Sequence, residues 1–534
     1  MNITNQNQQD PENYTADQNK QDTNNTELSP NMSPVTYKKE EPLLVRAVVD
    51  NFSAFGVGSI LYGLFFCFCI YQNFMAVTSV LLCAATIGYV LFCFKKLSVK
   101  TDNKKWFFII SICLLGLSNM LTDSVVLAFL NYVGIILLFF CFLLRHFYDT
   151  KEWDFSKFCS ALSRTIICSV GRFNYPFKSL QQYLKEHRKR KNTKIYYVFL
   201  GILIAIPLLL VVCSLLLSAD VVFRSFSDRL FSGLFENIDF GTIFAVVFTI
   251  CFGMFSSYCI LIELAFQDIN PVMENKKTME PIIAITFSSI LTVIYLCFSI
   301  IQIAYLFIGN MKLPDGYTYA AYARQGFFQL LFVCLINLVL VLFCQKHYRE
   351  NKVLKTILTI ICGCTYIMIA SSTMRMLLYI ASYQLTFLRI FVLVSLLTLA
   401  ICLTGVVISI YKSSFPLFFF MTVTVTVCYL LFSLARPDAI TAAYNCQREN
   451  VDAYYLSDLS LDAVPAMERA GVFDADGPLN GEAYNQILEN FREASHKKSG
   501  NMSPRKFNLS VYRADRILNL SLIHISEPTR LRCI

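Results

Sequence analysis

The feature that most constrains this chain is a series of long apolar runs. Each run has roughly 17 to 25 residues, enough to cross a hydrocarbon core of about 30 Å as a helix. In lipid every backbone polar group must be hydrogen-bonded within the protein, so a spanning segment is either a helix or a strand of a closed barrel. Barrel strands alternate between apolar and polar residues, and these runs do not. The chain is 55% hydrophobic and 16% charged, so the sequence predicts an all-α, polytopic integral membrane protein.

Eleven segments have the length and composition of membrane spans. They are residues 55–71, 74–94, 106–121, 124–144, 195–217, 243–266, 282–307, 326–343, 356–380, 391–411 and 415–435. The third segment is the shortest and only just long enough to cross a bilayer.

Lysine and arginine are concentrated in alternate loops between these spans. They gather between residues 95 and 105, in 145–194 and between 346 and 355, whereas the intervening loops hold few. The positive-inside rule then predicts a cytoplasmic N-terminus and, with eleven spans, a C-terminal tail outside the cell. This placement accounts for the net charge of +9. No nucleic-acid-binding motif accompanies it, so we expect the lipid bilayer and not nucleic acid as the partner.

The spans divide the chain into six predicted segments. We expect a disordered polar cytoplasmic tail (1–41), a four-span region (42–144), a basic cytoplasmic loop (145–194), a seven-span core (195–435), a small external helical tail (436–521) and a foreign end (522–534). The first segment lacks the apolar content needed for a core. The last contains IHISEPTRLRCI, which resembles a translated sequencing adapter.

The basic loop contains a candidate amphipathic helix. Its apolar residues Phe177, Leu180, Tyr183 and Leu184 recur at helical spacing beside many cations. This pattern is typical of a helix that lies on the anionic inner leaflet of a membrane. Membrane topology alone would also place cations here, and both interpretations stay open.

Five stretches resemble motifs of one bacterial membrane-protein family. They are LLSAD (216–220), LPDGYTYAAYARQGFFQLL (313–331), STMRMLLYIASYQLTFLRI (372–390), RPDAITAAYN (436–445) and LSLDAVPAM (459–467). Together they are similar to the family catalogued as domain of unknown function 4173, with the related family 4153 as the alternative. The resemblance covers residues 195–466. It implies a multi-pass protein of the bacterial cytoplasmic (plasma) membrane whose activity is uncharacterised, and it brings no catalytic residues.

Catalytic and cofactor-binding signatures are missing from the sequence. It holds no Walker loop, no G-x-S-x-G, no H-E-x-x-H and no dinucleotide fingerprint, and its five histidines all lie outside the predicted spans. Most of the 20 cysteines lie within spans, where they serve as small apolar residues. We therefore predict no catalytic residue, no metal site and no cofactor.

Two ionisable residues stand out within the apolar runs, Glu263 and Arg375. Such groups are costly in lipid and often functional. Glu263 is expected near the inner end of its span and Arg375 near the outer end, so they should not meet each other. For Arg375 we favour a structural pair with Asp220, at the outer end of the fifth span. Snorkelling towards water and a ligand-binding role are the alternatives.

One outer loop is both aromatic and polar. It carries Asp315, Tyr317, Tyr319, Tyr322 and Arg324. Tyrosine at a membrane interface most often anchors the chain there, which is the interpretation we favour. The functional alternative is a surface that stacks on and hydrogen-bonds an envelope glycan or a lipid headgroup.

Three functions are compatible with these patterns. Sparse intramembrane charge favours a non-enzymatic scaffold or sensor of the cell envelope. A transporter or permease for a small solute would have helices broken by glycine or proline and polar sites at mid-membrane, of which there is little sign. An outer-face enzyme or binder of lipid-linked substrates would need convergent acids. The sequence favours the first function and leaves enzymatic activity open.

Overall fold

The computed structural model describes residues 42–148, 153–186, 240–266, 277–304, 327–448, 451–473 and 482–526, with residue 150 and isolated positions between 201 and 219. Within these residues all regular structure is helical, apart from one isolated β-bridge between Met279 and Tyr348. The predicted all-α polytopic fold is confirmed. The predicted polar tail, 1–41, lies outside the described residues.

Nine helices in the described part of the chain are long and apolar enough to cross a membrane. They are α2 (Phe52–Ile70), α3 (Val77–Lys96), α5 (Val125–Phe147), α10 (Phe240–Phe266), α11 (Pro281–Gln302), α13 (Phe327–His347), α14 (Lys352–Tyr383), α15 (Phe387–Tyr411) and α16 (Leu417–Leu434). The predicted third span is α4 (Lys105–Leu121), an apolar helix of 17 residues. The predicted fifth span, 195–217, falls where only isolated positions are described, so the count of eleven stays a prediction.

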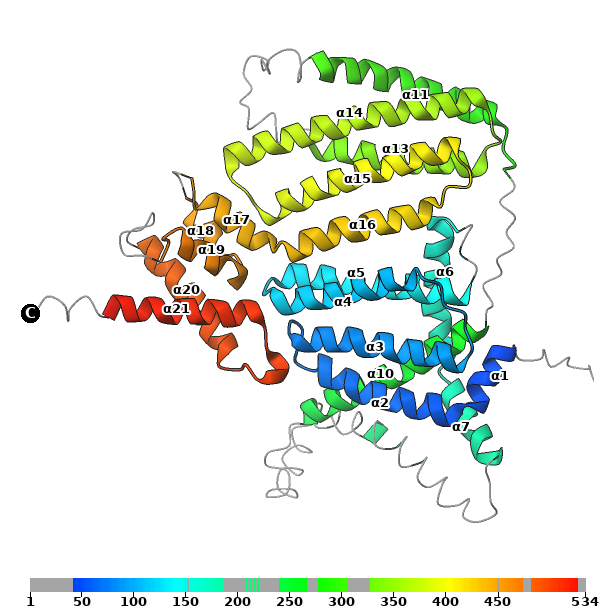
Figure 1. The fold of residues 1–534 in the computed structure, drawn as a ribbon, viewed down its shortest axis with the longest axis vertical. Coiled ribbons are helices and arrows are strands. Elements are labelled where there is room, and N and C mark those ends of the chain that lie inside the picture. The colour runs from blue at the N-terminus through cyan, green and yellow to red at the C-terminus, as the bar shows by residue number, and fades with distance from the viewer. Residues whose placement is uncertain are drawn as a thin grey trace, which may run out of the picture. The chain divides into compact units, whose positions relative to one another are not determined.

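The spans form two bundles that share α16 (Figure 1). The first bundle contains α1 (Leu43–Asp50), α2–α5, α6 (Phe155–Gly171), α7 (Tyr175–Glu186) and α10. Its core includes Phe55, Phe108 and Phe142. The second contains α11 and α13–α15, with Leu358 and Leu396 in its core. Helix α16 packs on α15 of the second bundle and on α4 of the first.

Helices α2 and α10 of the first bundle cross at unusually close range. A Cβ atom on Gly63 would lie 2.7 Å from the carbonyl oxygen of Ile250, and one on Gly253 would lie 3.1 Å from the Cα atom of Gly63. Only glycine permits this approach of two backbones, as in other membrane helix pairs with small residues at the interface.

The loops that connect the spans fall at two ends of the helices (Figure 1). We call them the Asp123 end, after the turn between α4 and α5, and the Arg145 end, after the last turn of α5. Ion pairs join separate segments of the chain at the Arg145 end, including Lys346 of α13 to Asp154 at 2.5 Å. Two helices, α6 (Phe155–Gly171) and α7 (Tyr175–Glu186), also lie there.

The remaining helices form a C-terminal module, which we define as the described residues from 437 to 526. Its elements are α17 (Pro437–Asn445), α18 (Ala453–Ser457), η2 (Leu461–Ala463), α19 (Val464–Arg469), α20 (Glu482–Ser499), η3 (Pro504–Lys506) and α21 (Leu509–Ser526). They enclose their own apolar core, with Met467, Phe491 and Leu518 nearly fully buried. Helix α21 continues past residue 522, where the sequence predicts the foreign end to begin.

Candidate functional site

The turn between α4 and α5 is short, polar and almost completely buried. It consists of Thr122, Asp123 and Ser124. Thr122 is extended and its hydroxyl oxygen accepts a hydrogen bond from the Ser124 amide at 3.1 Å, which holds the turn tight. A polar turn at the end of two membrane helices is ordinarily exposed to water. Here the C-terminal module covers it, and the buried polar groups of the turn are stable only when they are hydrogen-bonded.

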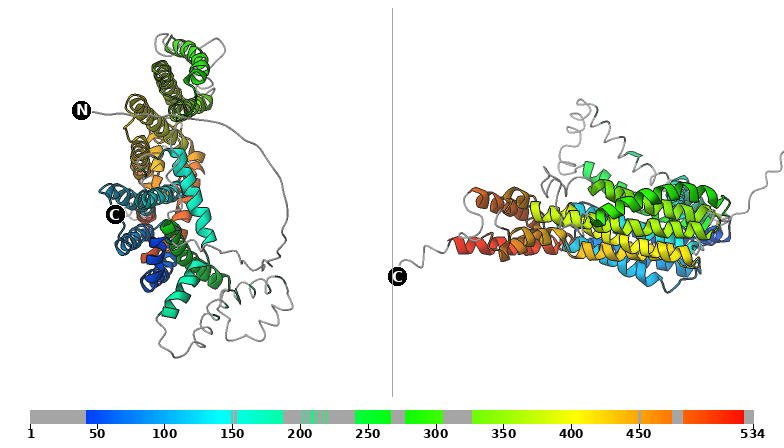
Figure 2. Two further views of the ribbon diagram at one scale, coloured as in Figure 1. Left: turned by 90° about the vertical axis from the view of Figure 1, so that its right-hand side faces the viewer. Right: turned by 90° about the horizontal axis from the view of Figure 1, so that it is seen from above.

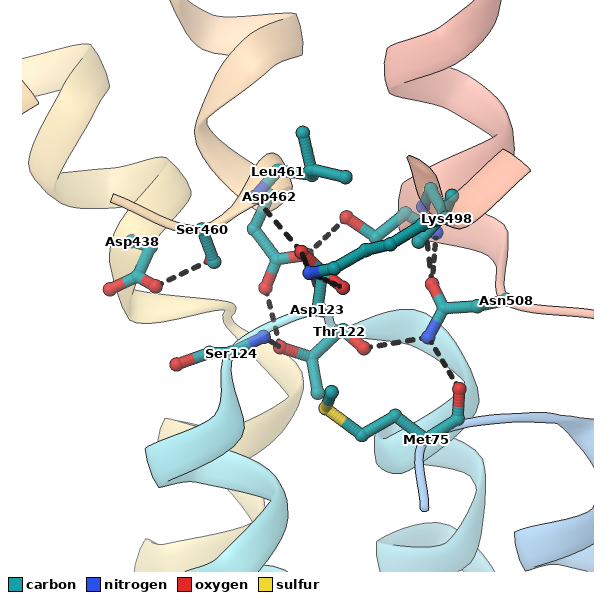
Figure 3. A network of polar contacts seen from close by, with 12 residues as sticks. Met75, Thr122, Asp123, Ser124, Asp438, Ser460, Leu461, Asp462, Lys498 and Asn508 are labelled. Carbon is teal, nitrogen blue, oxygen red and sulfur yellow. Dashed lines mark hydrogen bonds and ion pairs between the residues drawn. The ribbon is translucent and has the colours of Figure 1, made fainter. Parts of the chain in front are cut away.

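Asp462, in η2 of the module, binds this turn with its carboxylate (Figure 3). One oxygen accepts the Thr122 hydroxyl at 2.5 Å, and the other accepts the Asp123 amide at 3.1 Å and the hydroxyl of Ser510. The residue is only 1% exposed. Burial raises the pKa of the Asp462 carboxyl, and these three donors oppose the rise because they stabilise the charged form.

Asp123 forms the complementary contact from the turn to the module. The ammonium nitrogen of Lys498, near the end of α20, lies 2.7 and 2.8 Å from its two carboxylate oxygens. The Leu461 amide donates a longer bond of 3.4 Å to the same carboxylate. The Asp123 side chain is 4% exposed and that of Lys498 is 43% exposed. Burial raises the pKa of Asp123, and the charge of Lys498 opposes that rise.

Asn508 uses both ends of its side-chain amide at this junction. Its oxygen accepts the amides of Ser510 and Val511, at 2.9 and 3.1 Å, and so caps the N-terminus of α21. Its nitrogen donates to the backbone oxygens of Thr122 at 2.8 Å and Met75 at 3.0 Å. One buried side chain therefore starts a helix of the module and fastens it to two loops of the first bundle (Figure 3).

The module is also fastened to the second bundle. Asn445, at the end of α17, is fully buried and forms two hydrogen bonds with the backbone of Leu385, between α14 and α15. Its oxygen accepts the Leu385 amide at 2.8 Å, and its nitrogen donates to the Leu385 carbonyl at 2.9 Å. Nearby, the Tyr455 hydroxyl accepts the Phe387 amide at 3.3 Å. The module thus joins the Asp123 ends of both bundles.

A seam of buried polar side chains lies within the spans and links the two bundles. Asn131 of α5 donates to Asn119 of α4 at 2.8 Å, and its oxygen accepts the hydroxyls of Tyr429 and Ser433, both on α16, at 2.8 and 2.7 Å. Ser118 bonds Ser433 at 2.6 Å. Interhelical hydrogen bonds of this kind hold membrane helices in one arrangement, because the bonding groups cannot turn to water.

The structure describes only part of the predicted outer-face site. Six of its residues lie outside the described residues, namely Asp220, Asp315, Tyr317, Tyr319, Tyr322 and Arg324. The predicted Arg375–Asp220 pair therefore stays a prediction. Arg375 itself is buried on α14. One helical turn before it, Ser371 donates a hydrogen bond of 2.6 Å to Gln302 of α11.

Glu263, the other ionisable residue, lies near the Arg145 end of α10 and is 3% exposed. The Arg172 side chain, just after α6, donates to its carboxylate at 2.8 Å. The Arg172 guanidinium also lies 3.7 Å from the centre of the Phe266 ring. The sequence pattern alone did not point to this partner. Among the described residues, no group of three or more His, Cys, Asp or Glu side chains is placed to hold a metal ion.

Comparison with known proteins gives a family for the chain. A family model described as a domain of unknown function, DUF4153, matches residues 109–470, more than half of the chain. The chain belongs to the DUF4153 family. This is the alternative named from the sequence motifs, and the preferred family, 4173, is not confirmed. The match also begins well before residue 195, where the resemblance was placed. No curated protein and no solved structure matches the chain.

The DUF4153 match covers only part of the junction in sequence. It includes the α4–α5 turn and Asp462, but it ends before Lys498 and Asn508. No role for Asp462, Lys498 or Asn508 could be predicted from the sequence. Asp462 lies in the LSLDAVPAM motif and Asn445 in RPDAITAAYN, so both were within quoted motifs without a role. Lys498 and Asn508 lie in polar stretches of the sequence that contain none of the quoted motifs.

Proposed function

We propose that this DUF4153 protein is a non-enzymatic scaffold or sensor of the bacterial cytoplasmic membrane that holds its C-terminal module at the outer face. The excess of Lys and Arg in the loops at the Arg145 end supports an inner position for that end. The Asp123 end and the module would then lie outside. The family describes a domain of unknown function, so the proposal rests on the geometry of the junction.

The observation that carries the proposal is that the acids of the junction are used in joining the module to the membrane helices. The oxygens of Asp462 accept bonds from Thr122, Asp123 and Ser510. Both oxygens of Asp123 bond Lys498. A catalytic acid must reach its substrate, whereas these two carboxylates are nearly fully buried. This arrangement favours a structural role for the strongest polar cluster described at this end.

Polar side chains within the spans support the same conclusion. Besides the seam at Asn131, Asn337 of α13 donates to Thr365 of α14 at 3.0 Å. Gln345 of α13 bonds Ser409 of α15 at 3.2 Å. These groups fasten one helix to another, which is the role expected of polar residues in a fixed membrane scaffold.

The proposal is tested by separating the charge of Asp462 from its shape. Asp462→Asn keeps a hydrogen-bonding group of the same size, whereas Asp462→Leu leaves three buried donors without an acceptor. In cells that lack the gene, we expect the Asn variant to restore the wild-type phenotype and the Leu variant to fail. Membrane levels of each variant, measured by immunoblot, serve as the control. An Asn variant that is inserted and folded but inactive would overturn the proposal and favour an enzyme.

A further inference from the structure

Helix α6 lies across the spans at the Arg145 end instead of running parallel to them (Figures 1 and 2). Both of its ends are tied to membrane helices. At its start, Asp154 caps the helix through the Lys157 amide at 2.8 Å and pairs with Lys346 of α13. Just after its end, Arg172 pairs with Glu263 of α10. The helix is therefore held in place at the level where the spans end.

One face of α6 packs on the protein. Phe158, Ala161, Thr165 and Ser169 are buried and recur every three or four residues, as one face of a helix does. The helix contacts α10 and α5. Leu162, beside this face, is partly buried and also packs against the core of the first bundle.

The second face of α6 is apolar and exposed. Ile167 is 70% and Val170 is 75% exposed, and Phe155 and Ile166 are also exposed. At about 100° per residue, these side chains gather on one side of the helix, next to its buried face. Apolar side chains at this density would be unfavourable in water.

The third face carries the cations. Lys157 and Arg164 are seven residues apart, so they lie on one side of α6, and Arg164 is exposed. The sequence of the helix, FSKFCSALSRTIICSVG, contains no acidic residue. A helix with an apolar face beside a purely cationic face is complementary to an anionic membrane surface, which offers acyl chains below and phosphates above.

We propose that α6 is an interfacial helix that binds anionic phospholipid, with Ile167 and Val170 among the acyl chains and Lys157 and Arg164 at the headgroup phosphates. Which leaflet α6 binds depends on the orientation proposed above, whereas the binding of anionic lipid does not. The proposal moves the lipid contact away from α7. In α7 the rings of Phe177 and Tyr183 lie 5.6 Å from Phe255 and 6.0 Å from Phe52, ring centre to ring centre, so they face the protein.

The test uses the purified full-length protein with the photoreactive residue p-benzoylphenylalanine at position 167. The protein is reconstituted into vesicles of phosphatidylcholine with about one third phosphatidylglycerol. After irradiation, mass spectrometry measures lipid adducts on the peptide that contains position 167. We expect adducts enriched in phosphatidylglycerol relative to its share of the membrane. Adducts in proportion to the two lipids would overturn the anionic preference, and cross-linking to protein alone would overturn the lipid contact.

The contribution of the cations is measured on the same background. Lys157→Gln with Arg164→Gln should lower the enrichment in phosphatidylglycerol, by up to roughly fivefold for each cation removed. The matched control is Lys497→Gln with Arg513→Gln, which removes two exposed cations of the C-terminal module. We expect no change in that variant. An equal loss in both variants would show an effect of net charge and overturn the proposed site. Because this assay needs no cellular activity, its outcome is independent of the scaffold test at Asp462.

Discussion

The ion pair between Asp123 and Lys498 gives the sharpest test of how the module is held. Replacing Lys498 with Met removes the donor at 2.7 and 2.8 Å from the two carboxylate oxygens. Of the hydrogen bonds to the Asp123 carboxylate described above, only the 3.4 Å bond from the Leu461 amide would remain. Breaking a fully buried pair costs about 3 to 5 kcal/mol. Lys498 is 43% exposed, so water can partly replace it, and we expect about 1 to 3 kcal/mol instead.

A double-mutant cycle separates this pair from other effects of the substitutions. Asp123→Asn keeps the shape of the side chain and removes its charge. With the charge absent, the further loss of Lys498 should matter little, so the double variant should cost less than the sum of the two single variants by about 1 to 2 kcal/mol. Hydrogen exchange of amides in α20 and α21, followed by mass spectrometry, reports the local opening free energy. Strict additivity would refute direct pairing.

The same pair predicts a dependence on pH. Burial raises the pKa of Asp123 above its ordinary value of 3.8, and Lys498 opposes the rise. Without Lys498 the pKa of the buried carboxyl should rise further. A carboxyl that binds its proton more tightly in the folded state stabilises that state as pH falls. The penalty of Lys498→Met should therefore shrink as pH is lowered from neutrality towards 3.8. A penalty that is independent of pH would refute the reasoning.

Three further predictions concern the Asn508 contacts, the crossing of α2 and α10, and the orientation in the membrane. Asn508→Ala removes a helix cap, worth about 1 kcal/mol, and the donor to two buried carbonyls. Asn508→Asp keeps the cap but places a carboxylate against those carbonyls, which repel it. Hydrogen exchange should therefore show a loosened module in both variants. A wild-type exchange pattern in the Asp variant would contradict the docking role. Gly63→Val should cost about 1 to 3 kcal/mol in detergent thermal stability through overpacking, whereas Gly88→Val, which has no neighbour within 4 Å, should be nearly neutral. Finally, an external thiol reagent that cannot cross membranes should label Asn480→Cys and not Lys189→Cys in intact cells; the reverse pattern would invert the proposed orientation.

The sequence by itself determined the class of fold and the approximate position of most spans. This was possible because crossing a membrane depends on local quantities, namely the length and apolar content of each run. Helix α14, for example, contains the predicted span 356–380 within Lys352–Tyr383. The same local reasoning identified Glu263 as costly in lipid, but it could not name Arg172 as its partner, because the two are 91 positions apart in the chain.

Only the tertiary structure decided which polar residues meet. Asp462 is 340 positions from Thr122, and Lys498 is 375 positions from Asp123. Each is an ordinary polar residue in its own segment, and only the folded chain brings them to one buried turn. Likewise, α6 and α7 are both amphipathic in sequence. Which face of each helix the first bundle covers is decided only in the fold, because the free energy of a polar or apolar side chain depends on its surroundings there.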